Sequence, residues 1–244
     1  MLKDLRIGNA VDLLDTLLEE PDLIVTDPPY AFGGEGEEHQ VTAHVAIALR
    51  EAARRLKDGR WMLVFSASSS RSLDYMKDSL RGLVTPVRDL TWCKPRPRTR
   101  VRTAGPQWAS VKVSVFRKGK GLPCPSSEAL DWIVAEPMTV GRRAQLPLEV
   151  ARWAVGPYSV PEGLFLDPFS GSGALCDAAV ACGMRAIGFE KQGRPLSISD
   201  VCCSNMVMVG SVERSWCPVH GPHSQPERLD GVRVAGAEVR RATD

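Results

Sequence analysis

The chain has 244 residues and a mass of 26.6 kDa, enough for one full-sized α/β core with a small appendage. Its 43% hydrophobic and 25% charged residues exclude a disordered chain, and no apolar stretch approaches the roughly 20 residues that a membrane helix needs. The formal net charge of +2 is too small to indicate a nucleic-acid partner, so that signal has to come from local clusters of charge.

Helical and strand-like hydrophobic patterns alternate in the first half of the chain. Asn9 is suited to cap a short helix that Pro21 ends, and the glycine-rich, acidic stretch 31–39 is expected to be a mobile loop. The predicted elements are a helix at 10–20, a strand at 23–26, an amphipathic helix at 41–56, a buried strand at 61–66 and a helix at 71–80.

The second half resumes this alternation after a stretch of prolines and arginines at 94–106. The predicted elements there are a strand at 111–116, a helix at 147–155 with Pro147 in its first turn, a strand at 163–167, a helix at 174–182 and a strand at 185–190. Strands that alternate with helices indicate an α/β fold with an open, mostly parallel, doubly wound Rossmann-like sheet.

The stretch "FLDPFSGSGALCDAAVACGMRAIGFEK" predicts a nucleoside site. A strand that ends in an acid is followed by a turn with Gly171 and Gly173, a helix and a strand that ends in Glu190, whose carboxylate could accept from ribose hydroxyls. The dinucleotide fingerprint would require glycine where Cys176 stands, and no phosphate-binding Gly-Lys-Ser/Thr occurs. S-adenosylmethionine, which has no pyrophosphate, fits this pattern; the alternative is a tight turn without a ligand.

The stretch "TDPPYA" places an acid and an aromatic residue around a rigid corner. An exocyclic amino group on adenine or cytosine is a poor nucleophile, because its lone pair is delocalised into the ring. Acceptors on both N–H groups, the Asp27 carboxylate and the Pro28 carbonyl, would help to localise that lone pair. Tyr30 could stack on the ring, and Pro29 stiffens the corner in advance. The alternative is a proline-stiffened turn with an incidental acid.

Together the two stretches resemble the amino-group DNA methyltransferases, specifically the permuted class in which Asp-Pro-Pro-Tyr precedes Asp-Pro-Phe-x-Gly-Ser-Gly. The resemblance covers roughly residues 5 to 191. Weaker similarities support it, namely "IGNAVDLL", "LREAARRLKDGRWMLVF", "LTWCKPRPR", "VKVSVFRKGKG" and "RRAQLPLEVARWAV". The chain departs from the family pattern at Asn9, where the family has an acid, and at Leu146, where it has a lysine.

The resemblance implies the site residues. Catalysis would rest on four consecutive residues, Asp27, Pro28, Pro29 and Tyr30. The cofactor S-adenosyl-L-methionine would be held by Asn9, Asp27, Gln145, Asp167, Phe169, Gly171, Ser172, Gly173 and Glu190. The Rossmann-like catalytic domain would span 1–191, and a C-terminal extension, loosely ordered or a small addition, would span 192–244.

A run of alternating cations suggests where nucleic acid binds. In an extended segment these side chains project from one side and would form a stripe along phosphates. The stripe consists of Lys94, Arg96, Arg98, Arg100 and Arg102. The alternative is a solvated basic loop. The surrounding range 94–145 is the candidate target-recognition insert, and the neighbouring Trp92 could be either a stacking or a core residue.

The cysteines point to an intracellular protein and not to a metal site. Seven cysteines without regular spacing are expected to be reduced in a soluble, cytoplasmic protein of a bacterial or phage-infected cell, and the chain start lacks a signal-peptide core. Cys217, His220 and His223 have ligand-like spacing, but no paired Cys-x-x-Cys exists, so no metal is predicted. Cys176 and Cys182 are expected to be small core residues.

The resemblance therefore implies a methyltransferase that acts on the amino group of a base flipped out of double-stranded DNA, in the manner of restriction–modification enzymes. Family members with Asp at the position of Asp27 more often modify adenine N6, so adenine is expected. The alternatives are cytosine N4, an RNA methyltransferase and a DNA-binding module on a degenerate scaffold. The permuted order favours DNA over RNA, and a homodimer is left open.

Overall fold

The computed structural model describes residues 2–29, 37–68, 70–95, 109–120, 129–140 and 143–191, together with 216–217 and 221–222. The chain divides into two compact units, Met1–Val201 and Cys202–Asp244. In the second unit, the described residues form one antiparallel pair of strands, β11 (Trp216–Cys217) and β12 (Gly221–Pro222). The rest of the predicted C-terminal extension lies outside the described residues.

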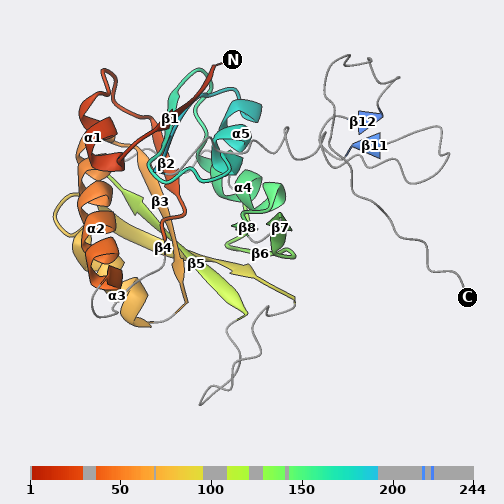
Figure 1. Ribbon diagram of the computed structural model, residues 1–244, viewed down its shortest axis with the longest axis horizontal. Helices are drawn as coiled ribbons and strands as arrows, with labels where there is room; N and C mark the ends of the chain where they lie inside the picture. The colour runs from red at the N-terminus through yellow and green to blue at the C-terminus, as the bar shows by residue number, and fades with distance from the viewer. Residues whose placement is uncertain are drawn as a thin grey trace, which may run out of the picture. The chain divides into compact units, whose positions relative to one another are not determined.

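The first unit is built on an eight-stranded sheet with the order β1-β10-β9-β2-β3-β5-β4-β6 (Figure 1). Five of its seven strand pairs are parallel, and β5 alone runs against the others. Its strands are β1 (Lys3–Ile7), β2 (Leu23–Thr26), β3 (Trp61–Ala67), β4 (Thr85–Cys93), β5 (Ser110–Arg117), β6 (Trp132–Val134), β9 (Leu164–Asp167) and β10 (Arg185–Glu190). A separate antiparallel pair consists of β7 (Met138–Val140) and β8 (Arg143–Gln145).

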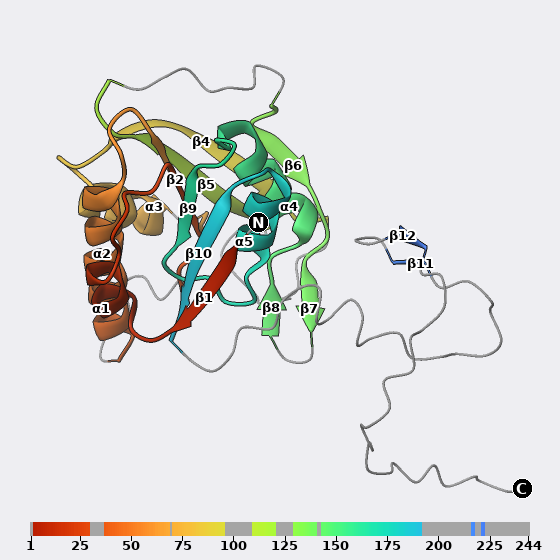
Figure 2. The same ribbon diagram turned by 90° about the horizontal axis from the view of Figure 1, so that it is seen from above.

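Helices cover both faces of this sheet (Figure 2). One face carries α1 (Ala10–Asp15), α2 (Glu37–Arg55) and α3 (Ser70–Ser79), and the other carries α4 (Leu148–Val155), the short 3-10 turn η1 (Gly156–Tyr158) and α5 (Ala174–Ala181). This arrangement confirms the predicted mostly parallel, doubly wound sheet. No helix in the described part of the chain is both long and apolar enough to cross a membrane.

The central strands are buried because helices pack on both of their faces. All four residues of β2 are buried, as are the first six residues of β3. Apolar side chains of α1 and α2 pack with the sheet in one core cluster that includes Leu14, Leu49 and Met62. The near-continuous apolar runs at 23–26 and 61–66 are therefore explained by burial on two sides.

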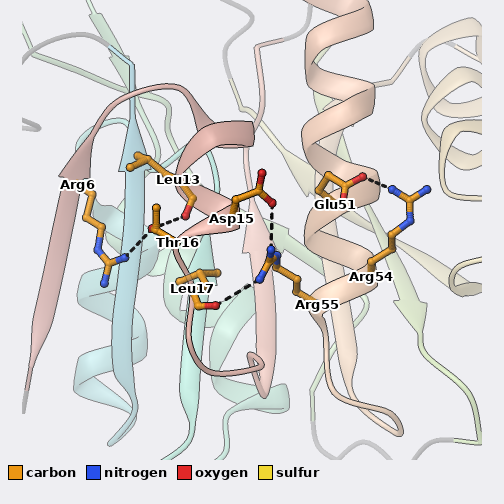
Figure 3. Close-up of polar contacts among 8 residues, drawn as sticks. All are labelled: Arg6, Leu13, Asp15, Thr16, Leu17, Glu51, Arg54 and Arg55. Carbon is orange, nitrogen blue, oxygen red and sulfur yellow. Dashed lines mark hydrogen bonds and ion pairs between the residues drawn. The ribbon is translucent and has the colours of Figure 1, made fainter.

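The predicted helix at 10–20 is wrong in length, since α1 ends at Asp15. The Thr16 hydroxyl donates to the Leu13 carbonyl at 2.7 Å, and Arg55 of α2 donates to the Leu17 carbonyl at 3.3 Å and to the Asp15 carboxylate at 3.0 Å (Figure 3). The Leu13 and Leu14 carbonyls accept from the Thr16 and Leu17 N–H groups at 3.1 and 3.2 Å, so bonds of the 3-10 type close the last turn instead of extending the helix. The leucine spacing continues to Leu17 and Leu18, but it does not correspond to helix beyond Asp15.

Other differences concern element bounds and missed strands. The predicted loop at 31–39 includes the first residues of α2, which begins at Glu37, and Pro147 is the N-cap of α4 and lies just before its first turn. The strand β4 and the short strands β1, β6, β7 and β8 were not predicted. Strand β5, inside the range 94–145, pairs with β3 and β4 within the main sheet, so any insert must flank it.

Candidate functional site

The sheet gathers the carboxyl ends of its parallel strands at one edge. β1 leads into Asn9, β2 into Asp27 and β4 into Lys94, while β9 and β10 end in Asp167 and Glu190. These residues lie far apart in the sequence, yet the strand order makes β1, β10, β9 and β2 direct neighbours. In open α/β sheets such an edge is where ligands bind.

Asp167 is the buried centre of this edge, with only 1% of its surface exposed. Its Oδ1 accepts hydrogen bonds from the Thr26 hydroxyl at 2.7 Å and from the Phe169 N–H at 3.1 Å. Its Oδ2 is also buried and has no hydrogen-bond partner among the residues that the structure describes. A buried acceptor without a donor is costly, so this oxygen is suited to receive a ligand.

The charge of Asp167 is strongly disfavoured in the fold. Its pKa is raised to about 7, because burial and, less strongly, the negative charges of Asp27 and Glu190 outweigh the hydrogen bonds from Thr26 and Phe169. Asp27 and Glu190 therefore both lie within electrostatic reach of Asp167. A cation bound here would restore the charged form.

The turn after Asp167 requires glycine. Gly171 has φ +51° and Gly173 has φ +82°, both in the left-handed region. A Cβ at Gly171 would meet no atom within 4 Å, so the backbone there is open to a ligand. The turn is held against β10, because the N–H and the hydroxyl of Ser170 donate to the Phe189 carbonyl at 2.8 and 3.1 Å.

The remaining predicted residues of the turn differ in their surroundings. Ser172 is half-buried in the turn, one residue before the N-cap of α5. The Phe169 side chain is also half-buried and packs on the apolar cluster between the sheet and α2. This packing holds the ring in a fixed position beside the turn.

Asn9 caps α1 with its side chain. Its Oδ1 accepts from the Val11 N–H at 3.0 Å and also contacts the His44 Nε2 of α2 at 2.7 Å. The neighbouring Gly8 N–H donates to the Glu190 carbonyl at 2.9 Å, so Asn9 lies beside the end of β10.

Gln145 and Leu146 lie where β8 leads into α4. The Gln145 Oε1 is buried and has no partner within the described ranges, so it is a second acceptor that a ligand could use. Leu146, the position at which the sequence departs from the family that it resembles, is 9% exposed and belongs to the core.

The proline corner follows β2 directly. Thr26 is fully buried, Asp27 is half-buried, Pro28 is buried and Pro29 is exposed. The buried Thr26 hydroxyl, bonded to Asp167, ties the corner to the glycine turn across the sheet. Tyr30 lies outside the described residues.

One cation of the predicted stripe is described, and it lies at this edge. The Lys94 ammonium lies 4.8 Å from the centre of the Trp92 ring, and the Trp92 Nε1 donates to the Ala135 carbonyl at 2.9 Å. Trp92 is 5% exposed and therefore a core residue, which decides between its two interpretations. The other members of the stripe, Arg96, Arg98, Arg100 and Arg102, lie outside the described residues.

Two cysteines of α5 have structural roles. Cys176 is buried, and burial raises the pKa of its thiol. Its Sγ lies 2.8 Å from the place of a Cβ at Gly188, which explains why that strand position is glycine. Cys182 is half-buried at the C-cap.

The tail residues with ligand-like spacing form no described metal site. Cys217 belongs to β11, whereas His220 and His223 lie outside the described residues. Within the described ranges, no group of three or more His, Cys, Asp or Glu side chains could hold a metal ion.

Three residues of the site were missed by sequence reasoning. Thr26 bonds Asp167, Ser170 anchors the turn and His44 contacts Asn9. A polar residue at the last buried position of a strand is a signal that could have identified Thr26, because such a group needs a partner. His44 had no comparable signal, since its partner is 35 residues away.

Comparisons with known proteins agree with this architecture. Residues 135–199 match the family model of the N6/N4 methyltransferases, described as DNA methylase. No curated protein matches the chain.

Several solved structures share the fold. The M1.HpyAVI-SAM complex has 19% identity and a TM-score of 0.62 and covers 79% of this chain and 95% of its own. The PvuII cytosine-N4-specific DNA methyltransferase has 17% identity and a TM-score of 0.68, with 80% and 84% covered. TTHA0409 of Thermus thermophilus, a putative DNA modification methylase complexed with S-adenosyl-L-methionine, has 20% identity and a TM-score of 0.62, with 85% and 97% covered. The chain therefore has the fold of these methyltransferase structures.

Proposed function

We propose that the chain is an S-adenosyl-L-methionine-dependent DNA methyltransferase of the permuted amino-group class, acting on adenine N6. The observation that carries this proposal is the convergence of Asp27, Asp167 and Glu190 at the carboxyl edge of the sheet, beside the left-handed turn at Gly171 and Gly173. The two acidic motifs are 140 positions apart in the chain, and the Thr26–Asp167 hydrogen bond joins them.

The residues at this edge fit the cofactor. S-adenosyl-L-methionine carries a cationic amino group and ribose hydroxyls, which are all donors, and it supplies a methyl group on a sulfonium that a nucleophile can attack. Among the described residues two buried acceptors lack donors, the Asp167 Oδ2 at this edge and the Gln145 Oε1 just before α4. A bound cation would also lower the raised pKa of Asp167. Glu190 would accept from the ribose, and Gly171 allows close approach of its backbone.

The proline corner would prepare the nucleophile. The Asp27 carboxylate and the Pro28 carbonyl would each accept one N–H of the base's amino group, which localises the nitrogen lone pair. As the N–C bond to the methyl group forms and the methyl group's bond to the sulfonium sulfur breaks, positive charge would develop on this nitrogen, and the Asp27 carboxylate would stabilise it. One proton then leaves the nitrogen through Asp27 to water. Tyr30 would stack on the flipped base.

Double-stranded DNA would approach along the same edge. Lys94 is held there against Trp92, and the arginines that follow would continue along the phosphates. The parts of the range 94–145 on either side of β5 are the candidate for target recognition, and residues 1–191 would form the catalytic domain. Asp27 as the first corner residue favours adenine over cytosine.

Methyl transfer to mixed-sequence duplex DNA tests this proposal. The protein is incubated with methyl-tritiated cofactor and DNA, and the DNA is digested to nucleosides that are separated by mass. N6-methyladenine is the expected product, whereas N4-methylcytosine would overturn the base assignment alone. In a parallel incubation with RNA, label on RNA but not on DNA would indicate an RNA methyltransferase. Cofactor binding or DNA binding without any transfer would indicate a degenerate scaffold, and Asp27→Asn serves as the inactive control.

A further inference from the structure

His44 is a polar residue of α2 that belongs to neither motif of the site. Its Nε2 lies 2.7 Å from the Oδ1 of Asn9, the N-cap of α1, and its side chain is half-buried. Asn9 lies at the carboxyl end of β1, next to the end of β10, because the Gly8 N–H bonds the Glu190 carbonyl at 2.9 Å. His44 is therefore linked through Asn9 to the edge of the sheet where the parallel strands have their carboxyl ends.

The direction of this hydrogen bond follows from a third group. The Val11 backbone N–H points at the same Asn9 oxygen at 3.0 Å, and an N–H can only donate. That atom is therefore the amide oxygen, and the His44 Nε2 must carry the proton that it donates. A carbonyl oxygen has two lone pairs, so Val11 and His44 together fill its acceptor capacity.

The orientation of the Asn9 amide is thereby determined. Its Nδ2 has two N–H donors, neither of which is bonded to a described residue. An acid at this position, as in the family pattern, would present an acceptor instead. The cap on α1 alone needs only the Val11 bond, so the contact from His44 adds a constraint on the amide that helix capping does not require.

We infer that His44 is a positioning residue that orients Asn9 so that the amide Nδ2 donates to an acceptor atom of the cofactor's nucleoside, a ribose oxygen or a ring nitrogen. This inference rests on the proposed function. The nucleoside end is indicated because Asn9 lies beside Glu190, the residue proposed for the ribose. Glu190 would accept from the hydroxyl donors of the nucleoside, whereas Asn9 would donate to one of its acceptor atoms.

The test distinguishes the effect of the Nε2 hydrogen-bond donor from the effect of the size of the His44 side chain. Glutamine places an N–H donor near the position of Nε2, whereas asparagine is too short to reach it. Calorimetry with S-adenosyl-L-homocysteine should show that His44→Gln binds like the wild type, while His44→Asn and His44→Ala bind about three- to tenfold more weakly, the range of one lost hydrogen bond. The same loss should appear with 5′-methylthioadenosine, which lacks the amino-acid end.

A second variant tests the polarity of Asn9 itself. Asp and Asn are equally good N-caps, so Asn9→Asp should leave the melting temperature near that of the wild type and weaken binding of both probes by a similar factor. Equal or tighter binding by Asn9→Asp would overturn the inference, as would equal Kd values for wild type and His44→Asn. Binding by His44→Gln as weak as that of His44→Asn would also overturn it, because the N–H donor would then not be what orients Asn9. Absence of binding by the wild-type protein would refute the proposed function itself.

Discussion

Replacing Asp167 by Asn should change how the stability of the protein depends on pH. The pKa of this carboxyl is raised from an ordinary value of 3.8 to about 7, so between these values the unfolded chain is ionised while the fold keeps the proton. Stability of the wild type therefore falls as pH rises through this window, by about 1.4 kcal/mol per pH unit for this one group. The Asn variant has no such group and lacks this fall.

The magnitude follows from the shift of about three pKa units. At pH 4 the protonated acid and the amide are both neutral and similar in shape, so the two proteins should differ little. At pH 8 the wild type holds an ionised Asp167 whose Oδ2 has no described partner. The Asp167→Asn protein should then be more stable by about 4 kcal/mol, with the difference growing between pH 4 and 7.

Urea denaturation of both proteins at several pH values, without cofactor, measures this difference. Asp22→Asn is the matched control, because Asp22 is also buried: burial raises its pKa, but the hydrogen bonds from Lys57 and the Leu164 N–H outweigh burial and lower it. Its ionised form stabilises the fold at neutral pH, and this contribution is lost as pH falls through the lowered pKa. The control should therefore be less stable than the wild type at pH 7 and approach it in acid.

A difference between Asp167→Asn and wild type that does not change from pH 4 to 8 would refute the assignment of a raised pKa. The cofactor provides a further check. A cationic ligand that pairs with Asp167 should stabilise the wild type more than the variant, because only the wild type regains a partner for its buried charge.

Three further predictions concern the proposed roles. Asp27→Ala should lose methyl transfer by several orders of magnitude while the Kd for the cofactor changes little; an equal loss of cofactor affinity would argue against separate roles. Glu190→Gln should weaken cofactor binding in calorimetry and leave DNA affinity without cofactor unchanged, and unaltered cofactor binding would contradict a ribose contact. Replacing Arg96, Arg98 and Arg100 by Ala should reduce the slope of log affinity against log salt by about 0.9 for each phosphate that is no longer neutralised, whereas a solvated loop would leave the slope unchanged.

Local sequence determined the elements and the residue types of the site. The buried strands, the left-handed turn at Gly171 and Gly173 and the cap at Asn9 all depend on neighbours a few positions away, so hydrophobic period and glycine spacing predicted them. The proline corner after β2 is local in the same sense. Short strands such as β6 have too few residues for a period to be recognised. The helix α1 was predicted too long because 3-10-type bonds from the Thr16 and Leu17 N–H groups close it while the leucine spacing continues.

The tertiary structure decided which of these groups lie together. The burial of Asp167, its bond to Thr26 and the charges that raise its pKa come from strands on different parts of the chain. Trp92 is buried in the core and its N–H is satisfied by the Ala135 carbonyl, 43 residues away. His44 contacts Asn9 because α2 packs beside α1. Each depends on contacts between segments tens of residues or more apart. Such contacts are set by the strand order and by the packing of helices on the sheet, which a local pattern does not encode.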